Sequence, residues 1–592
     1  MALKSGATVQ GFFSTPENRD FYSNFEFEEL SRDFQEIRLV QVSVDSNKTI
    51  RCQLSRHRLG DVCGQYYALS YCAGDPASSR PILLNDEAFD VFANLEHALL
   101  QALVFLDGVA DCLLWVDQIC INQHDDQERS HQVGFMRDIY SGCKGALICL
   151  STADPREGEA DIAIDWLKDY RITSFSGVLR NVHSDSFVDG LLAFYDLCER
   201  PWWRRAWVQQ EFICSPTAYF MSRGRWIDWD WLSGFLPSLC STLQEFALGE
   251  YMVRVSLQRL GLDFLSVVPV RRDFLGMIPG GAEEYKGPSG DFLSMIPVRR
   301  DPSFLGVIPG GTEAATEPAN VISGVEHNLW VIVRRAMTAS GAVTAVEHLV
   351  KVKVSWKGDE DLKEMLSLSR HRHSSDPRDR VFAFLGLAHP GYGMEADYSE
   401  SNTLHDVLVD AARRIVEFEG DLGLLSYAVG SSRENGSSLP SWVPDWTSDD
   451  FLDLRPWAQL PTPPDARVRF LDRPTVQLED ASRLQVRGLK VDSIWEDVPI
   501  WRNAPNDCVF RTKRGYTLRC RPVCREGDEL WILLGARWLF VLRPRTGQEG
   551  YTLVSEAEEM HLEKLPADKI DIGKVMDGIL LSREDVESIT LF

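Results

Sequence analysis

The side chains best suited to chemistry follow an apolar run, in the stretch LLWVDQICINQHDDQER at residues 113–129. The run is typical of a strand buried on both faces. Asp117, Cys120, Asn122 and Gln123 come directly after its apolar part. In a doubly wound sheet, ligands bind outside the carboxyl ends of the strands. Carboxylates and amides here therefore predict a ligand-binding crevice. The alternative is a structural turn, because Asp and Asn also cap turns and helix starts.

A helix predicted over residues 125–143 continues this pattern. Its residues Glu128, Gln132, Met136 and Tyr140 are spaced so that they share one helix face. Glu128 and its neighbour Arg129 lie near the start of the helix, next to the polar turn. Met136 and Tyr140 continue the face into the core.

A second group lies in RPWWRRAWVQQEF, residues 200–212. Its arginines and tryptophans are interleaved: Arg200, Arg204, Arg205, Trp202, Trp203 and Trp207. If this stretch is helical, Trp207 and Glu211 share a face, with Gln210 beside them. Tryptophan can desolvate a carboxyl and raise its pKa, which suits acid–base work. Arginine and tryptophan together also suit a ligand with a flat ring and phosphates. The alternative is a buried Arg–Glu network among core tryptophans.

These groups need elements that position them, and the hydrophobic pattern supplies strands and helices in alternation. It predicts strands over residues 36–44, 50–56, 66–71, 111–120 and 145–151, and helices over residues 94–106 and 125–143. Strands alternating with helices indicate crossover connections. We therefore predict an α/β fold with a doubly wound, flavodoxin-like parallel sheet. Residues 113–117 and 145–151 should be adjacent or near-adjacent central strands.

Shifts in pattern along the chain divide it into five parts. We predict a leader (1–36), the α/β domain (37–240), a flexible insertion (241–320), a helical region (321–440) and a small β-rich module (441–592). The insertion holds an internal repeat, because residues 263–272 recur with two changes as residues 291–300. Two imperfect copies are too few for a stacked repeat fold. We expect few core contacts there.

Composition excludes several functions. The 592 residues carry 62 Lys and Arg against 87 Asp and Glu, a net charge of −25, which argues against nucleic acid as a partner. Most of the 13 cysteines lie in apolar runs, and no apolar stretch is long enough to span a membrane. We expect a cytoplasmic protein without a metal site, since Cys520 and Cys524 lack further ligands at zinc spacing. No G-x-G-x-x-G motif follows the first strand, so no cofactor is firmly predicted.

Three blocks together resemble the signature of the heterokaryon-incompatibility (HET) domain of filamentous fungi. They are YYALSYCAGD at residues 66–75, residues 113–143 and residues 200–212, and the resemblance spans roughly residues 37–215. The middle block is the most specific, with matches at Asp117, Cys120, Asn122, Gln123, Glu128, Arg129, Gln132, Met136 and Tyr140. One departure is Ala73, where the family has tryptophan. The segments at residues 376–388 and 439–446 resemble sequences that commonly follow a HET domain.

The resemblance implies fungal non-self recognition and programmed cell death, with protein partners of an incompatibility pathway and self-assembly as a further expectation. HET domains also look like remote relatives of TIR domains. That likeness implies that Glu211, after Trp207, matches a glutamate that serves nicotinamide-nucleotide cleavage, with NAD as substrate. Whether the chain is an enzyme stays open, because Ala73 favours a pseudo-enzyme or scaffold. We expect one crevice to contain Asp117, Asn122, Gln123, Glu128, Arg129, Arg204, Trp207 and Glu211.

Overall fold

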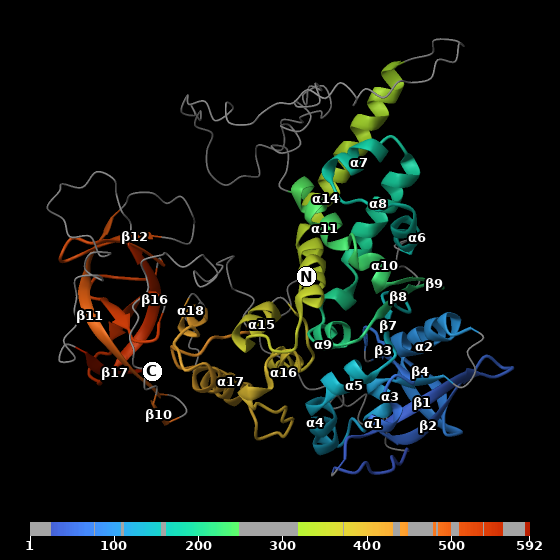
Figure 1. Cartoon of the computed structure of the whole chain (residues 1–592), viewed down its shortest axis with the longest axis horizontal. Coiled ribbons are helices and arrows are strands. Elements are labelled where there is room, and N and C mark those ends of the chain that lie inside the picture. The colour runs from blue at the N-terminus through green and yellow to red at the C-terminus, as the bar shows by residue number, and fades with distance from the viewer. Residues whose placement is uncertain are drawn as a thin grey trace.

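The computed structural model in Figure 1 describes most of the chain. The described residues are 25–32, 34–75, 77–107, 112–154, 161–247, 318–370, 372–429, 439–447, 477–480, 483–498, 508–521, 523–536, 538–559 and 586–592. The predicted repeat and most of the predicted leader lie outside them. The predicted domain boundaries stay predictions, although the element classes follow the predicted order.

The N-terminal part is built on one nine-stranded sheet. Its strands are β1 (Glu36–Val44), β2 (Ile50–Arg58), β3 (Tyr66–Ser70), β4 (Ser79–Leu84), β5 (Glu87–Phe92), β6 (Leu113–Trp115), β7 (Gly145–Cys149), β8 (Ala218–Ser222) and β9 (Arg225–Asp228). They lie in the order β5-β4-β2-β1-β6-β3-β7-β8-β9. Strands β6, β3, β7 and β8 are mutually parallel. Both flanks bring in antiparallel pairs, at β1–β2, β1–β6, β4–β5 and β8–β9.

The α/β prediction is confirmed, but the sheet is mixed rather than wholly parallel. Short loops explain the antiparallel pairs β1–β2, β4–β5 and β8–β9, because a turn of a few residues can join only antiparallel strands. The centre behaves as predicted, since every residue of β3 and β7 is buried. Strand β3 lies between β6 and β7, so the two predicted central strands are near-adjacent.

Two predicted elements are interrupted. Strand β6 ends at Trp115, and the residues after it form the short helix α3 (Asp117–Cys120). The predicted helix over residues 125–143 is split at Phe135 into α4 (Asp126–Gly134) and α5 (Met136–Gly142). The Asp125 side chain accepts hydrogen bonds from two backbone amides and fixes the start of α4.

Helices surround the sheet and extend beyond it. They are α1 (Leu59–Val62), α2 (Ala93–Phe105), α6 (Ile162–Asp169), α7 (Phe175–Asn181), α8 (Asp185–Cys198), η2 (Pro201–Arg204), α9 (Val208–Ile213), α10 (Trp229–Ser233) and α11 (Leu236–Ala247). The long helix α14 (Pro318–Ser355) packs against α11, α8 and α9, so the later part of the chain contributes to the same core. Figure 1 shows α14 running alongside these helices.

A helical region and a β-module complete the chain. The helical region holds α15 (Leu362–Ser369), α16 (Asp379–Leu385), η6 (Pro390–Tyr392), α17 (Leu404–Glu419) and α18 (Leu425–Ala428). The β-module holds β10 (Gln477–Asp480), β11 (Arg483–Val498), β12 (Cys508–Thr512), β13 (Thr517–Cys520), β14 (Glu529–Leu533), β15 (Leu539–Pro544), β16 (Tyr551–Glu559) and β17 (Glu587–Leu591). Strand β11 pairs with both β12 and β14, which closes this sheet on itself.

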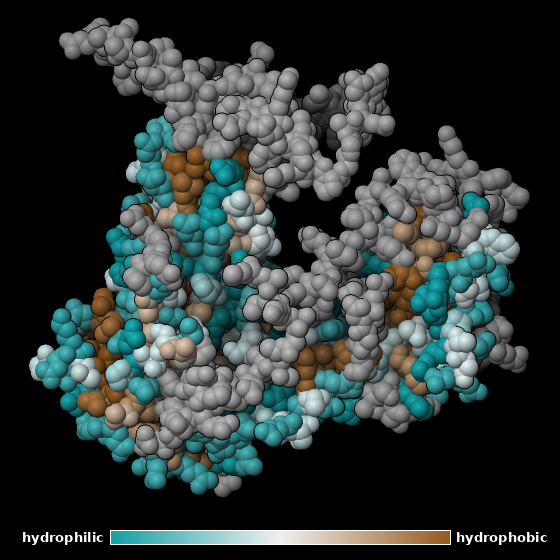
Figure 2. All heavy atoms as spheres, turned by 180° about the vertical axis from the view of Figure 1, so that it is seen from behind, coloured by the Kyte–Doolittle hydropathy of each residue, from teal (hydrophilic) through white to brown (hydrophobic). Residues whose placement is uncertain are grey.

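Among the coloured residues of the face shown in Figure 2, teal polar ones cover more of the surface than brown apolar ones. Among the described residues, no helix combines the length and the apolar character needed to cross a membrane.

Candidate functional site

A buried polar cluster lies at the carboxyl end of β3. Ser70 is the last residue of that strand, and its hydroxyl donates a hydrogen bond to Glu211 Oε2. Trp202 Nε1 in turn donates to Ser70 Oγ at 2.7 Å. Glu211 lies on α9 and is 3% exposed. The strand end therefore holds the glutamate carboxyl directly, and Trp202 orients the serine that does so.

Arg205 and Asp117 extend this cluster. Arg205 Nη1 donates to the Tyr71 carbonyl and lies 3.9 Å from Glu211 Oε1. Asp117, at the start of α3, receives a hydrogen bond from the Tyr71 hydroxyl and interacts electrostatically with Arg205 and Glu211. We call Ser70, Tyr71, Asp117, Trp202, Arg205 and Glu211 the Glu211 cluster.

Two carboxyls share one guanidinium in this cluster, and their pKa values reflect it. Burial raises the pKa of Glu211 to about 7, against the opposing effects of Arg205 and Ser70. Burial also raises the pKa of Asp117, again opposed by Arg205. Like charges close together disfavour ionisation, so the nearby Asp117 pushes the pKa of Glu211 further upward.

A carboxyl with this pKa can donate or accept a proton near neutral pH. The cluster is also reachable from one side, because the Arg205 side chain is 20% exposed and Asp117 is partly exposed. The arrangement can therefore place a carboxyl that exchanges protons beside a partly exposed guanidinium. It can also serve as a buried network that orients α9 on the sheet.

Glu128 lies in a different site. Its carboxylate forms a two-pronged ion pair with Arg38 on β1, at 2.6 and 3.0 Å. Glu128 Oε1 also accepts the backbone N–H of Asn122 at 2.6 Å. Arg38 donates to the Cys120 carbonyl at 3.0 Å. This buried ion pair thus holds the turn at residues 117–123 in place and is not part of the Glu211 cluster.

The amides of the opening motif stabilise the turn itself. Gln123 Nε2 donates to the Asp117 carbonyl at 2.9 Å, and Asn122 Oδ1 accepts the N–H of His124 at 3.2 Å. The Cys120 thiol accepts the N–H of Val116 at 3.3 Å. Gln132 is buried and donates to the Glu36 carbonyl at 2.9 Å. The structural alternative predicted for the amides is therefore what the geometry supports.

Arg129 and Trp207 meet the helical region. The guanidinium of Arg129 lies 4.1 Å from the centre of the Tyr398 ring. The Tyr398 hydroxyl donates to Asp379 at 2.6 Å, and the Trp207 side chain also hydrogen-bonds to Asp379. Burial raises the pKa of Asp379 to about 6. Two predicted site residues thus contact Tyr398 and Asp379 of the helical region rather than the predicted crevice.

The remaining predicted residues have separate places. Arg204 has an exposed side chain, and Arg200 is buried at the start of η2. Gln210 Nε2 donates to the Phe382 carbonyl at 3.4 Å, which faces it away from the cluster. Tyr140 is buried within electrostatic reach of Glu211 and Asp117. Met136 is buried.

The structure therefore brings together Asp117 and Glu211 but not the rest of the predicted crevice. Sequence reasoning chose Arg204, and the structure instead uses its neighbour Arg205. It also missed Ser70 and Tyr71. One signal was available, because Ser70 ends an apolar strand and Tyr71 follows it, much as Asp117 comes just after an apolar strand.

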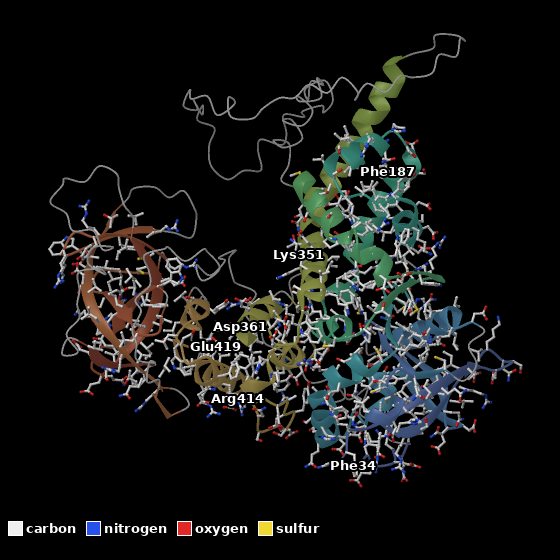
Figure 3. The ribbon with its side chains drawn as sticks, in the orientation of Figure 1. Phe34, Phe187, Lys351, Asp361, Arg414 and Glu419 are labelled. Atoms are coloured by element: carbon white, nitrogen blue, oxygen red, sulfur yellow. The ribbon has the colours of Figure 1, made fainter. Side chains whose placement is uncertain are left out.

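Other charged groups lie apart from this site. Figure 3 labels Asp361 and Glu419 in the helical region, where Lys363 pairs with both and lies 2.5 Å from Glu419. Burial raises the pKa of Glu419 to about 7. Within the described parts of the chain, no three His, Cys, Asp or Glu side chains are grouped to hold a metal ion.

Comparison with known proteins identifies the class. The family model described as heterokaryon incompatibility protein (HET) matches residues 66–211. Residues 66–211 therefore match a HET domain, and the match begins just before Ser70 and ends at Glu211.

A curated relative points to fungi. Heterokaryon incompatibility protein 6, OR allele, of Neurospora crassa is 24% identical over 430 residues, which cover 64% of this chain and 53% of the relative. The chain thus spans about half the length of the curated relative that it matches. No solved structure is detectably similar.

Proposed function

We propose that this protein acts in fungal heterokaryon incompatibility, and that its HET domain signals programmed cell death after non-self recognition. One observation carries the proposal: the HET match encloses a buried cluster in which two carboxyls share one arginine. Such a cluster costs stability, because buried charges lose hydration. Clusters of this kind with shifted pKa values are common at functional sites. The Neurospora crassa relative supports the pathway.

Induced expression of the full chain in a filamentous fungus tests this function. Wild type should kill, whereas Arg205→Gln should not, because Glu211 and Asp117 then lose their common counter-ion. Arg204→Gln is the matched control, since the adjacent side chain is exposed and lies outside the cluster. Viable cells with abundant, folded wild-type protein would refute the function. Equal killing by both variants would refute the role of the cluster.

A second candidate is hydrolysis of NAD at its nicotinamide–ribose bond. The observation that favours it is the position of Glu211 beside Ser70, with a pKa of about 7. In this reaction the bond to nicotinamide breaks and positive charge develops on the ribose. An ionised Glu211 would stabilise that charge while nicotinamide leaves as the neutral base. Water would then add to the ribose carbon and release one proton to the solvent.

Purified protein incubated with NAD tests the second candidate. Nicotinamide release should rise with protein concentration if assembly promotes the reaction, and Glu211→Gln should abolish release. Killing without nicotinamide release would instead favour the scaffold alternative, in which HET-domain contacts carry the signal.

A further inference from the structure

The orientation of α9, which carries Glu211, depends on a segment far along the chain. This helix has only six residues, Val208–Ile213. Isolated helices of that length are not stable in water. Neighbouring structure must therefore hold it, and the HET match contributes part of that support, from Ser70 on β3 and from helix α5.

The other side of α9 contacts residues 372–386. The Gln210 amide donates to the Phe382 carbonyl at 3.4 Å. With its amide oxygen facing the guanidinium, Gln209 accepts two hydrogen bonds from Arg372, both at 3.2 Å. Trp207, the residue before α9, bonds to Asp379. Three positions shortly before Glu211 are thus held from outside the match.

The same segment fixes the backbone at Arg205. The N–H of His373 donates to the Arg204 carbonyl at 2.6 Å, and the N–H of Ala206 donates to the His373 carbonyl at 2.9 Å. Arg205 and His373 thereby form a one-residue parallel bridge. Arg372 also donates to the Trp203 carbonyl. The backbone that carries the Arg205 side chain is consequently held on both sides of that residue.

Gly386 packs closely against the Gln210 side chain on α9. A Cβ placed there would lie 2.8 Å from the Gln210 side-chain amide. The backbone does not demand glycine, since Gly386 has φ −69° and ψ −12°. Gln210 is 2% exposed and has little room to move. The glycine is therefore needed for contact with α9 rather than for conformation.

We propose that residues 372–386 form a positioning element that completes the HET site, so that Glu211 and Arg205 are set by contacts from the helical region as well as by the HET domain. This inference rests on the proposed function for its cellular readout. Residues 372–386 do not touch the reacting groups; they act through Gln209, Gln210 and the Arg205 backbone.

Gly386→Ala in the full chain tests the element. We expect loss of killing and backbone hydrogen exchange in residues 208–213 about tenfold faster or more, because local opening becomes easier. The matched control is Gly341→Ala on α14, where a Cβ would meet nothing within 4 Å. The control should kill and exchange as wild type does.

A second substitution separates positioning from general damage. Gln210→Ala shortens the side chain that the added methyl group of Gly386→Ala would strike, so the double variant should exchange no faster than Gln210→Ala alone. Additive effects would overturn the proposal, as would equal exchange in Gly386→Ala and Gly341→Ala. A wild-type chain that does not kill would refute the proposed function, while the exchange comparison would still decide the positioning claim.

Discussion

Two buried charged sites lie on the same sheet and differ in how their charges balance. At one, Glu128 meets Arg38 one to one, with two short hydrogen bonds. At the other, Glu211 and Asp117 share Arg205, and the nearer contact is 3.9 Å. The first is a matched pair that fixes a turn. The second leaves a carboxyl poised near neutral pH. Both glutamates lie within the family match, so the match does not distinguish them, whereas the charge balance around each carboxyl does.

The two sites should differ most in the folding stability that is lost when each glutamate is replaced by glutamine. Glu128→Gln should lower the free energy of unfolding by about 3–5 kcal/mol at pH 5, because it strands a buried arginine. Glu211→Gln should change it by only about 1 kcal/mol at that pH, because the wild-type carboxyl is then mostly neutral and glutamine has nearly its shape. Urea denaturation measures both. Equal losses would show that Glu211 is part of a matched network too.

The second difference is in pH dependence. The pKa of Glu211 is raised from 4.5 to about 7 in the folded protein, so the folded state holds this proton more tightly. Stability from this group is full below pH 4.5 and falls as pH rises through 7. Relative to wild type, Glu211→Gln should therefore gain about 3 kcal/mol between pH 4 and pH 9. Parallel curves for the two proteins would contradict the raised pKa.

The smallest effect concerns the serines that end two parallel strands. Ser70 at the end of β3 bridges Trp202 and Glu211, so Ser70→Ala should cost about 1–3 kcal/mol. Ser222 at the end of β8 is equally buried, and its hydroxyl has no hydrogen-bond partner among the described residues. Ser222→Ala should therefore be neutral or slightly stabilising. Thermal unfolding of the two variants gives the comparison directly.

The sequence predicts the central strands well, because runs such as Gly145–Cys149 are apolar throughout and can only be buried. It predicts less of the site. Trp207 has helical dihedral angles and its carbonyl accepts the N–H of Glu211 at 3.2 Å, as the four-residue spacing predicts. Its side chain nevertheless bonds to Asp379, whereas that of Glu211 bonds to Ser70. Arg205 is extended, with φ −71° and ψ 144°, and this single residue decides which arginine turns inward. No local pattern encodes that choice.

The sequence also does not identify which distant residues contact each other. Arg38 and Glu128 are 90 residues apart, and nothing near either residue identifies the other. The same holds for Gln210 and Phe382, which are 172 residues apart. Helix and strand periods report which face of an element is buried. They do not report which distant element covers it.

The strand order of the N-terminal sheet limits where recombination between related genes can occur without disrupting the fold. The family match covers residues 66–211, yet β6 inside it pairs with β1 before it, and β7 inside it pairs with β8 after it. A recombination event at either limit of the match would join strands from two alleles within one hydrogen-bonded sheet. Chimaeras of related HET proteins should consequently stay folded only when the crossover falls before β1 or after β9. The whole sheet should therefore be inherited as one unit.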